Sequence, residues 1–394
     1  AVISSIETEN GAQFAAKIFA DCSYEGDLMA QSGVTFTWGR ESAAQYGESL
    51  AGVRSETPFH QFRMDLSPYG ADHKLLPEIA PDPSGPPGSA DRRVQAYNFR
   101  LIFSRDPANQ VPYPEPAHYD PARYELLARL LAAAPDLHFD QVVSIGPIPN
   151  QKADINNNGP FSTDFIGRSW DYPNASYQRR AEIFSEHEEY TKGFLWFLAH
   201  DPRVPAALQK EANQWGLAAD EFTGTDHWPP QLYIREARRM VGEYVMTQRD
   251  IQNDLAKPDA IGMGSYNSDS HNVERIVNAA GFVRNEGDMQ VPVKPYQIPY
   301  RILLPKRAEA RNLLVPVCFS ASHVAYSTLR MEPQYMILGH AAGVAAAMAV
   351  RKSIAVQDVD TAALTRTLVE QGAILEYVPS TQTPLVNRFR RGEK

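Results

Sequence analysis

The stretch that most constrains the fold lies near the end of the chain and reads Gly339-His340-Ala341-Ala342-Gly343-Val344-Ala345-Ala346-Ala347-Met348-Ala349. Its pattern predicts a helix from about Gln334 to Lys352. A helix with such short side chains lets another backbone or a flat ligand approach closely. Its N-terminal amides carry about half a positive charge, which favours a phosphate or the electron-rich edge of a ring. A tightly packed buried helix explains the same composition, so both interpretations stay open.

The start of the chain predicts a hairpin and a short helix. Two runs with strand character, over 2–6 and 14–20, flank Asn10-Gly11, a strong signal for a two-residue turn. The second run continues into Asp21-Cys22-Ser23-Tyr24-Glu25-Gly26-Asp27, and a helix is expected from Leu28 to Gln31. Nucleotide ligands bind where strands end in such residues at the carboxyl edge of an α/β sheet. An ordinary loop with a helix cap is the alternative.

Between these ends the sequence predicts a mixture of elements. Alternation over 93–103 predicts a strand, and helical spacing predicts helices over 121–134, 174–198 and 231–250, so that 121–255 reads as mostly helical. Strand character returns over 296–304 and 312–317. A last helix is expected over 361–371, with Asp360 as its N-cap and Gly372 as its stop.

These elements suggest a domain organisation in which both ends of the chain belong together. Residues 1–55 and 296–352 are expected to form one discontinuous domain. Residues 56–295 are expected to form a largely helical substrate or cap domain inserted into it, and 353–394 a C-terminal helix and tail. A length of 394 residues fits two or three domains.

Composition excludes several classes of protein. Hydrophobic residues make up 43% and charged residues 22%, as in globular proteins, and the net charge of -9 argues against nucleic acid and anionic membranes as partners. Only Cys22 and Cys318 are present, which excludes a disulfide scaffold, and no motif typical of a metal site occurs. Without a long apolar run, a soluble protein is expected, secreted or cytoplasmic.

Several motifs occur in the same order along almost the whole chain, and together they resemble the FAD-dependent oxidoreductase family, in particular its xanthan-lyase-like subgroup. The motifs are Ala16–Asp21 with Tyr24–Ala30, Gly39–Glu41 with Tyr46–Gly52, Gln95–Arg100, Lys152–Asn157, Leu232–Met240, Ser320–His323 with Arg330–Pro333, and Gly339–Gly343. The resemblance is specific for the family and says nothing specific about the substrate.

The resemblance implies an α/β fold with a Rossmann-like, glutathione-reductase-type FAD-binding domain that is incomplete. Family members open with a strand, Gly-x-Gly-x-x-Gly and a helix that bind the ADP pyrophosphate. The sequence contains no such fingerprint, and Gly262-Met263-Gly264-Ser265 is only a glycine pair. The expected partners are therefore a small-molecule substrate and an N-terminal fragment or second chain that completes the FAD site.

The same resemblance implies roles for individual residues. The expected cofactor-binding residues are Tyr24, Glu25, Gly26, Asp27, Ser322, Arg330, Gly339, Ala342 and Gly343. The expected catalytic residues are Asn98, Arg100, His271 and His323, with Asp269 beside His271 as an acid–base neighbour. The alternatives are a surface or capping role for His271 and a packed polar role for His323. Arg235, Arg238 and Arg239 are expected to form structural ion pairs.

Two main functions follow from this interpretation, and a third, a flavin protein that catalyses a non-redox elimination, is not separated from the first by the sequence. The first is an FAD-dependent oxidoreductase, as a fragment or subunit, that oxidises a small organic substrate such as a carbohydrate by hydride transfer to the flavin. The second is a non-catalytic binding or scaffold protein that retains the fold without the nucleotide-binding half.

Overall fold

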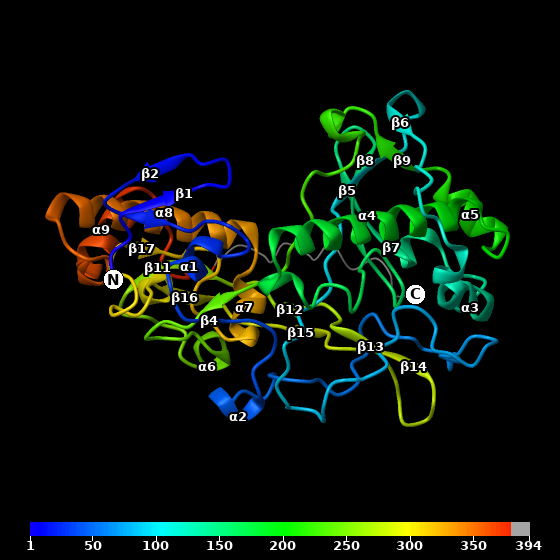
Figure 1. Cartoon of the computed structure of the whole chain (residues 1–394), viewed down its shortest axis with the longest axis horizontal. Helices are drawn as coiled ribbons and strands as arrows, with labels where there is room; N and C mark the ends of the chain where they lie inside the picture. Colours follow the sequence, from blue (N-terminus) through cyan, green and yellow to red (C-terminus); the bar gives the residue numbers. More distant parts are fainter. Residues whose placement is uncertain (380–394) are drawn as a thin grey trace.

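The computed structural model describes residues 1–379. The last part of the expected C-terminal unit 353–394, residues 380–394, lies outside the described residues. Figure 1 shows two lobes, with the blue N-terminal and orange C-terminal segments together in one lobe and the cyan and green middle segments in the other. Yellow strands run along the lower side from the first lobe toward the second.

The first and last described segments meet in a parallel strand pair. Strand β3 (Phe19–Ala20) pairs with β17 (Leu313–Leu314), and Phe19 lies opposite Leu313. Helix α1 (Asp27–Gln31) follows β3, and helices α8 (Glu332–Lys352) and α9 (Thr361–Glu370) follow β17. Next to this pair, the side chain of Asn312 donates to the carbonyl oxygen of Lys17, 295 positions away in the sequence. The domain bounds themselves stay a prediction.

Short strand pairs and helices complete the first lobe. The remaining elements are β1 (Ser5–Glu7) with β2 (Gln13–Ala15), β4 (Phe36–Thr37) with β10 (Arg239–Met240), β11 (Ala260–Gly264) with β16 (Tyr296–Pro299), β12 (Ser268–Ser270) with β15 (Met289–Val291), α2 (Ala43–Tyr46), α6 (Gln248–Gln252) and α7 (His323–Leu329). The expected hairpin is confirmed, but Glu7 pairs with Gln13, so its connection over 8–12 is longer than a two-residue turn.

The second lobe is built on a five-stranded antiparallel sheet in the order β6-β9-β5-β8-β7. Its strands are β5 (Leu101–Ser104), β6 (Gln110–Val111), β7 (Val143–Ile148), β8 (Lys152–Asn157) and β9 (Gly216–Ala218), and its helices are α3 (Glu125–Ala133), α4 (Tyr177–His200) and α5 (Ala206–Ala212). Aromatic side chains fill its core, and the rings of Phe165 and Tyr190 stack with centroids 4.1 Å apart. The hairpin of β13 (Glu274–Val277) and β14 (Val283–Glu286) extends beneath this lobe (Figure 1).

Four expected helices are confirmed because their local signals agree with their packing. They are the helices expected over 121–134, 174–198, 334–352 and 361–371, and the short helix expected over 28–31 is also present as α1. Helix α4 begins after Ser176, whose hydroxyl accepts a hydrogen bond from the Arg179 amide at 3.2 Å. Helix α9 begins after Asp360, which accepts from the Ala363 amide at 3.1 Å.

The expected helix over 231–250 is wrong. This segment is extended, with β10 in its middle, and α6 begins only at Gln248. Its charged side chains Arg235, Glu236 and Arg239 are almost fully buried in ion pairs with distant segments. A helix would turn these side chains in several directions, whereas the extended backbone lets each reach its buried partner.

Three other expectations need correction. The middle segment is not largely helical, because it contains the five-stranded sheet and the β13–β14 hairpin. The strand expected over 93–103 forms a ladder only from Leu101 onward. The strand expected over 296–304 ends at Pro299, where a 3₁₀ turn over Tyr300–Leu303 begins. Within residues 1–379, no helix is both long and apolar enough to cross a membrane.

Candidate functional site

Tyr233 lies where several of the expected site residues meet. Its backbone amide donates to the carbonyl oxygen of Asn98 at 2.8 Å. The guanidinium carbons of Arg100 and Arg235 each lie 5.3 Å from the centre of its ring. Two predicted catalytic residues, Asn98 at the backbone and Arg100 at the ring, are therefore neighbours of Tyr233, which the sequence reasoning did not select as a site residue.

A buried ion-pair network connects this ring to His271. Nη1 of Arg235 lies 3.0 Å from Oδ1 of Asp164, and Oδ2 of Asp164 lies 2.7 Å from Nδ1 of His271. Nε2 of His271 lies 3.7 Å from Oδ1 of Asp269, whose carbonyl oxygen accepts from Nε and Nη2 of Arg330. We call residues 164, 235, 269, 271 and 330 the His271 network. The sequence predicted His271, Asp269 and Arg330, but no local signal marked Asp164.

Asn156 ties Asn98 to the His271 network. Its Oδ1 accepts from Nδ2 of Asn98 at 2.9 Å and from Nη2 of Arg235 at 3.1 Å. Oδ1 of Asn98 and Nε of Arg235 are buried without a hydrogen-bond partner among the described residues. Two polar atoms beside Tyr233 are thus available to a group that is not part of the described chain.

Burial and charge set the protonation of the network. Burial, reinforced by Arg235, lowers the pKa of His271 to about 4. Burial alone would raise the pKa of Asp164, but Arg235 and His271 hold it below its usual value. At neutral pH, the network therefore contains a neutral imidazole beside an ionised carboxylate. Because Nδ1 faces Asp164, the hydrogen-bond pattern assigns the proton to Nδ1 and leaves Nε2 as the basic atom.

Asp288 adds a second unusual carboxyl group nearby. Burial raises the pKa of Asp288 to about 7, with Asp269 and Asp164 contributing through charge repulsion. Its Oδ2 accepts from Nε2 of Gln290 at 3.3 Å, while its Oδ1 is buried and has no hydrogen-bond partner within the described residues. No pattern in the sequence indicated this group.

His323 belongs to a separate and deeper ion-pair cluster. Its Nδ1 lies 2.9 Å from Oε2 of Glu236, which also pairs with Arg239, and Arg239 contacts Glu41 at 2.6 Å. Burial alone would raise the pKa of Glu236, but His323 and Arg239 lower it to about 2. This arrangement favours the packed polar role for His323 over direct catalysis.

Gln95 connects the two clusters. Its Oε1 accepts from the backbone amide of His271 at 3.0 Å, and its Nε2 donates to Oε2 of Glu236 at 3.1 Å. Ser322 lies beside this deeper cluster, where its hydroxyl donates to Glu48 at 2.6 Å and accepts from the Ala325 amide. The Ser322 side chain is fully buried, and its two hydrogen-bond partners, Glu48 and Ala325, are residues of the same chain.

The acidic turn after β3 is fixed against the second lobe. Nη1 of Arg180 lies 2.6 Å from Oδ2 of Asp27, and Nη1 of Arg238 lies 2.5 Å from Oδ1. The Tyr172 hydroxyl donates to Glu25 at 3.0 Å. Asp27 and Glu25 therefore hold the lobes together, and a role in cofactor binding stays a prediction for both. The ion pairs expected for the arginines of 235–239 are confirmed.

Tyr24 reaches the first turn of α8, and Gly26 makes the close approach possible. The rings of Tyr24 and Tyr335 meet edge to face with centroids 5.9 Å apart. Gly26 has φ +68°, and a Cβ there would lie 2.9 Å from Cε of Met29 and 3.0 Å from Sγ of Cys318. The turn after β3 and the start of α8 are therefore in direct contact.

The glycine residues of α8 lie beyond this contact. A Cβ added at Gly339 or Gly343 would meet no described atom within 4 Å, whereas Ala342 is buried in the core of the first lobe. The two glycines thus share an open helix face that does not join the His271 network. Their expected cofactor contact stays a prediction.

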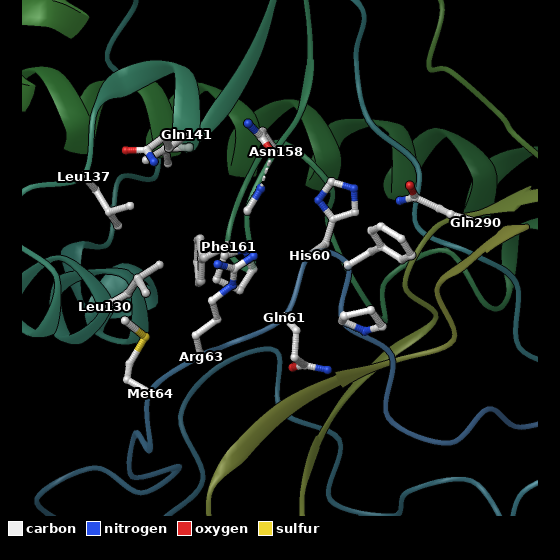
Figure 2. Close-up of a pocket in the computed structure, with 15 residues that line it drawn as sticks. His60, Gln61, Arg63, Met64, Leu130, Leu137, Gln141, Asn158, Phe161 and Gln290 are labelled. Carbon is white, nitrogen blue, oxygen red and sulfur yellow. Dashed lines mark hydrogen bonds between the residues drawn. The ribbon is translucent and has the colours of Figure 1, made fainter. Parts of the chain in front are cut away.

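A cavity of about 490 Å³ lies next to His60, and Figure 2 shows the residues that line it. His60 lines it, and the ring of His60 stacks on that of His271 with centroids 6.4 Å apart and planes at 10°. The sequence reasoning missed this cavity, because its lining comes from five separate parts of the chain. Among the described residues, no cluster of three or more His, Cys, Asp or Glu side chains is arranged to hold a metal ion.

Comparison with known proteins identifies the family of the chain. The family model described as FAD dependent oxidoreductase matches residues 1–368, which is nearly the whole described chain. No curated protein and no solved structure matches the chain. Because the model spans both lobes and every segment of the His271 network, the chain belongs to the FAD-dependent oxidoreductase family, whose members depend on FAD.

Proposed function

We propose that this chain binds the flavin ring of FAD beside Tyr233 and oxidises a small organic substrate there, with His271 as the catalytic base. One observation carries the proposal. Asn98, Arg100, His271 and Arg330 come from separate segments yet lie in one connected set of contacts around Tyr233 and the His271 network. Titratable groups with shifted pKa values that meet in this way are typical of functional sites.

The residues around Tyr233 fit the ring end of a flavin. The unpartnered Oδ1 of Asn98 and Nε of Arg235 supply one acceptor and one donor, as a ring edge with both N–H and C=O groups requires. Tyr24 and Tyr335 supply aromatic surface at the start of α8, whose helix dipole favours negative charge on a reduced ring. When bound, FAD supplies the two-electron acceptor for oxidation of the substrate.

His271 supplies the proton chemistry. The Nδ1–H group donates to Asp164, which fixes the ring orientation and stabilises the imidazolium after a proton arrives at Nε2. A substrate hydroxyl at Nε2 would lose its proton to this nitrogen while its carbon loses the hydride. Asp269, 3.7 Å from Nε2, is close enough to stabilise the resulting charge.

The phosphate end of FAD needs a segment that this sequence does not contain. The sequence has no Gly-x-Gly-x-x-Gly. We therefore propose that an N-terminal fragment or a second chain supplies a βαβ unit that completes a Rossmann-like domain with 1–55 and 296–352. The parallel β3–β17 pair and the open face of α8 at Gly339 and Gly343 support this arrangement.

Flavin reduction tests the proposal directly. The full-length native protein should carry the visible absorption of oxidised flavin, and a substrate should bleach it. His271→Gln should slow the bleaching about 100-fold or more while the bound flavin is retained. His118→Gln, an exposed histidine distant in the sequence, is the matched control and should bleach at the normal rate.

The alternative is a binding or scaffold protein that lacks catalysis. Its support is the absence of the glycine fingerprint from the sequence. Full-length protein that takes up no flavin after addition of FAD would favour this alternative and contradict the oxidoreductase proposal.

A further inference from the structure

The cavity in Figure 2 has an unusual charge pattern for an acidic protein. It is lined by residues of five chain segments, which are 58–64, Leu130, 137–142, 158–161 and Gln290. No Asp or Glu lines it, although the chain carries a net charge of -9. Arg63 is its one residue with a permanent charge, and this guanidinium forms no ion pair or hydrogen bond with the described part of the chain.

The Arg63 guanidinium is placed to contact a molecule bound in the cavity. Figure 2 shows its side chain rising from the loop of 58–64 toward Phe161 and Asn158, with the His60 ring facing the same space. The nearest acidic residue in the sequence, Asp65, forms an ion pair with Arg284, with 2.7 Å between Oδ1 and Nη2. The guanidinium therefore remains available, and its planar set of donors matches a carboxylate.

His60 is held in a strained position at the inner end of the cavity. Its φ is +47°, a left-handed conformation that a non-glycine residue adopts rarely. Asn285 fixes it by donating to its carbonyl oxygen at 2.8 Å, and Gln61 in turn donates to the Asn285 carbonyl at 2.8 Å. Burial lowers the pKa of His60, so its ring is a neutral donor at pH 7. Strain maintained by such contacts is typical of functional positions.

The rest of the lining combines apolar and polar side chains. Phe59, Met64, Leu130, Leu137, Val142 and Phe161 form its apolar part, and Gln61, Gln141, Asn158 and Gln290 add neutral polar groups. A volume of about 490 Å³ lies within the range of small-molecule sites. A small organic ligand with one anionic group would pair with Arg63 and contact both kinds of side chain.

We propose that this cavity binds a small organic carboxylate, with Arg63 pairing with the carboxylate and the neutral lining side chains contacting the rest of the molecule. As a binding site the cavity stands by itself. Its assignment as the substrate pocket rests on the proposed function, because the His60–His271 stack connects it to the catalytic base.

Calorimetry with benzoate and benzamide tests the binding site. The two probes have nearly the same shape and differ in charge, and the titrations use full-length protein at low salt. Benzoate should bind at least about tenfold more tightly than benzamide, as expected for one charge-assisted pair. Equal affinities, or no binding of benzoate, would overturn the proposal.

Two arginine variants test whether Arg63 is the residue that pairs with the carboxylate. Arg63→Gln should abolish the preference for benzoate over benzamide. Arg366→Gln removes the same charge from an exposed position on α9, in the other lobe, and should leave the preference intact. Arg63 is exposed, so its substitution should not affect folding. An unchanged preference in Arg63→Gln would contradict the assignment.

Competition separates the substrate assignment from the proposed function. If the flavin is reduced by a substrate, benzoate should raise the KM for that substrate without changing kcat. Benzoate binding without such competition would contradict the assignment of the cavity as the substrate pocket, but it would not contradict the proposed flavin catalysis. Benzoate binding by full-length protein that never takes up FAD would instead contradict the proposed function alone.

Discussion

Nδ1 of His271 lies 2.7 Å from a carboxylate oxygen of Asp164, although the two residues are 107 positions apart in the sequence. Both side chains are buried, and Arg235 balances the carboxylate on its other side. A buried imidazole with an ionised partner has a fixed orientation and a defined protonation state. This pair is therefore the structural basis of the catalytic proposal.

Asp164→Asn tests whether Asp164 positions His271. The amide can no longer stabilise a charged imidazole, so we expect flavin reduction to slow about 100-fold or more. The pH dependence should change as well, because Asp164 raises the pKa of His271 against the effect of burial. The apparent pKa of the rate should therefore fall in the variant, as measured by stopped-flow bleaching across pH. A slower rate with an unchanged pH profile would indicate a purely structural role.

Asp288→Asn should stabilise the protein at alkaline pH. The pKa of Asp288 is raised to about 7 by burial, above its value in the unfolded chain, so folding is favoured by the protonated form. That contribution is complete below the unfolded pKa of about 4 and is lost as pH rises through about 7. The neutral amide avoids this loss, so the gain in unfolding free energy should be about 2 kcal/mol larger at pH 8.5 than at pH 5.5.

Urea unfolding at the two pH values measures this gain. Asp171→Asn is the control, because Asp171 is exposed and forms no ion pair among the described residues. Its unfolding free energy should follow that of the unmodified protein at both pH values. An equal effect of Asp288→Asn at pH 5.5 and 8.5 would show that Asp288 is ionised throughout.

The cluster of Glu236 and His323 should make the protein sensitive to acid. Burial opposes ionisation of Glu236, but His323 and Arg239 outweigh it and lower the pKa to about 2. A lowered carboxyl pKa contributes stability that is present above the unfolded value of about 4.3 and is lost as pH falls toward 2. The unfolding free energy should therefore decline over this range, and Glu236→Gln should show a flatter decline. Parallel curves for the two proteins would contradict the assignment.

Gly26→Ala and Gly343→Ala should have opposite effects on stability. At Gly26, φ is +68° and a Cβ would press against Met29 and Cys318, so the unfolding free energy should fall by about 1–3 kcal/mol. At Gly343, the helix has open space, and alanine should raise stability by about 0.5–1 kcal/mol. Thermal melts measure both effects.

Flavin uptake by Gly343→Ala then tests the open face of α8. If this face receives the cofactor or the proposed N-terminal unit, the added methyl group should weaken FAD binding in spite of the higher stability. FAD affinity equal to that of the unmodified protein would mean that the face is not part of the flavin site.

Asp27→Asn tests the contact between the lobes. The substitution leaves Arg180 and Arg238 without their shared carboxylate, both of them largely buried. The unfolding free energy should fall by about 1–3 kcal/mol. Glu182→Gln removes one carboxylate from an exposed pair with Arg179 and should change it by less than about 1 kcal/mol. Similar losses of unfolding free energy in both variants would show that the Asp27 contact contributes no more to stability than an exposed ion pair.

The sequence by itself determined the local elements and the family. Helices α4 and α9 follow from capping residues and apolar spacing that lie within a few positions of one another, and the ordered motifs indicated FAD dependence. The extended course of 231–250 could not be found in this way, because Ala237, Met240, Val241 and Val245 have helical spacing.

Only the tertiary structure decided where the buried charges find their partners. Arg235 meets Asp164, Arg239 meets Glu41, and His271 stacks on His60, and each pair joins distant segments. A buried charge is stable only beside a compensating group, so these long-range pairs outweigh local helix preference. The same physical rule fixes the surroundings of His271: the sequence indicated this histidine, but only the tertiary structure brought Asp164 to it.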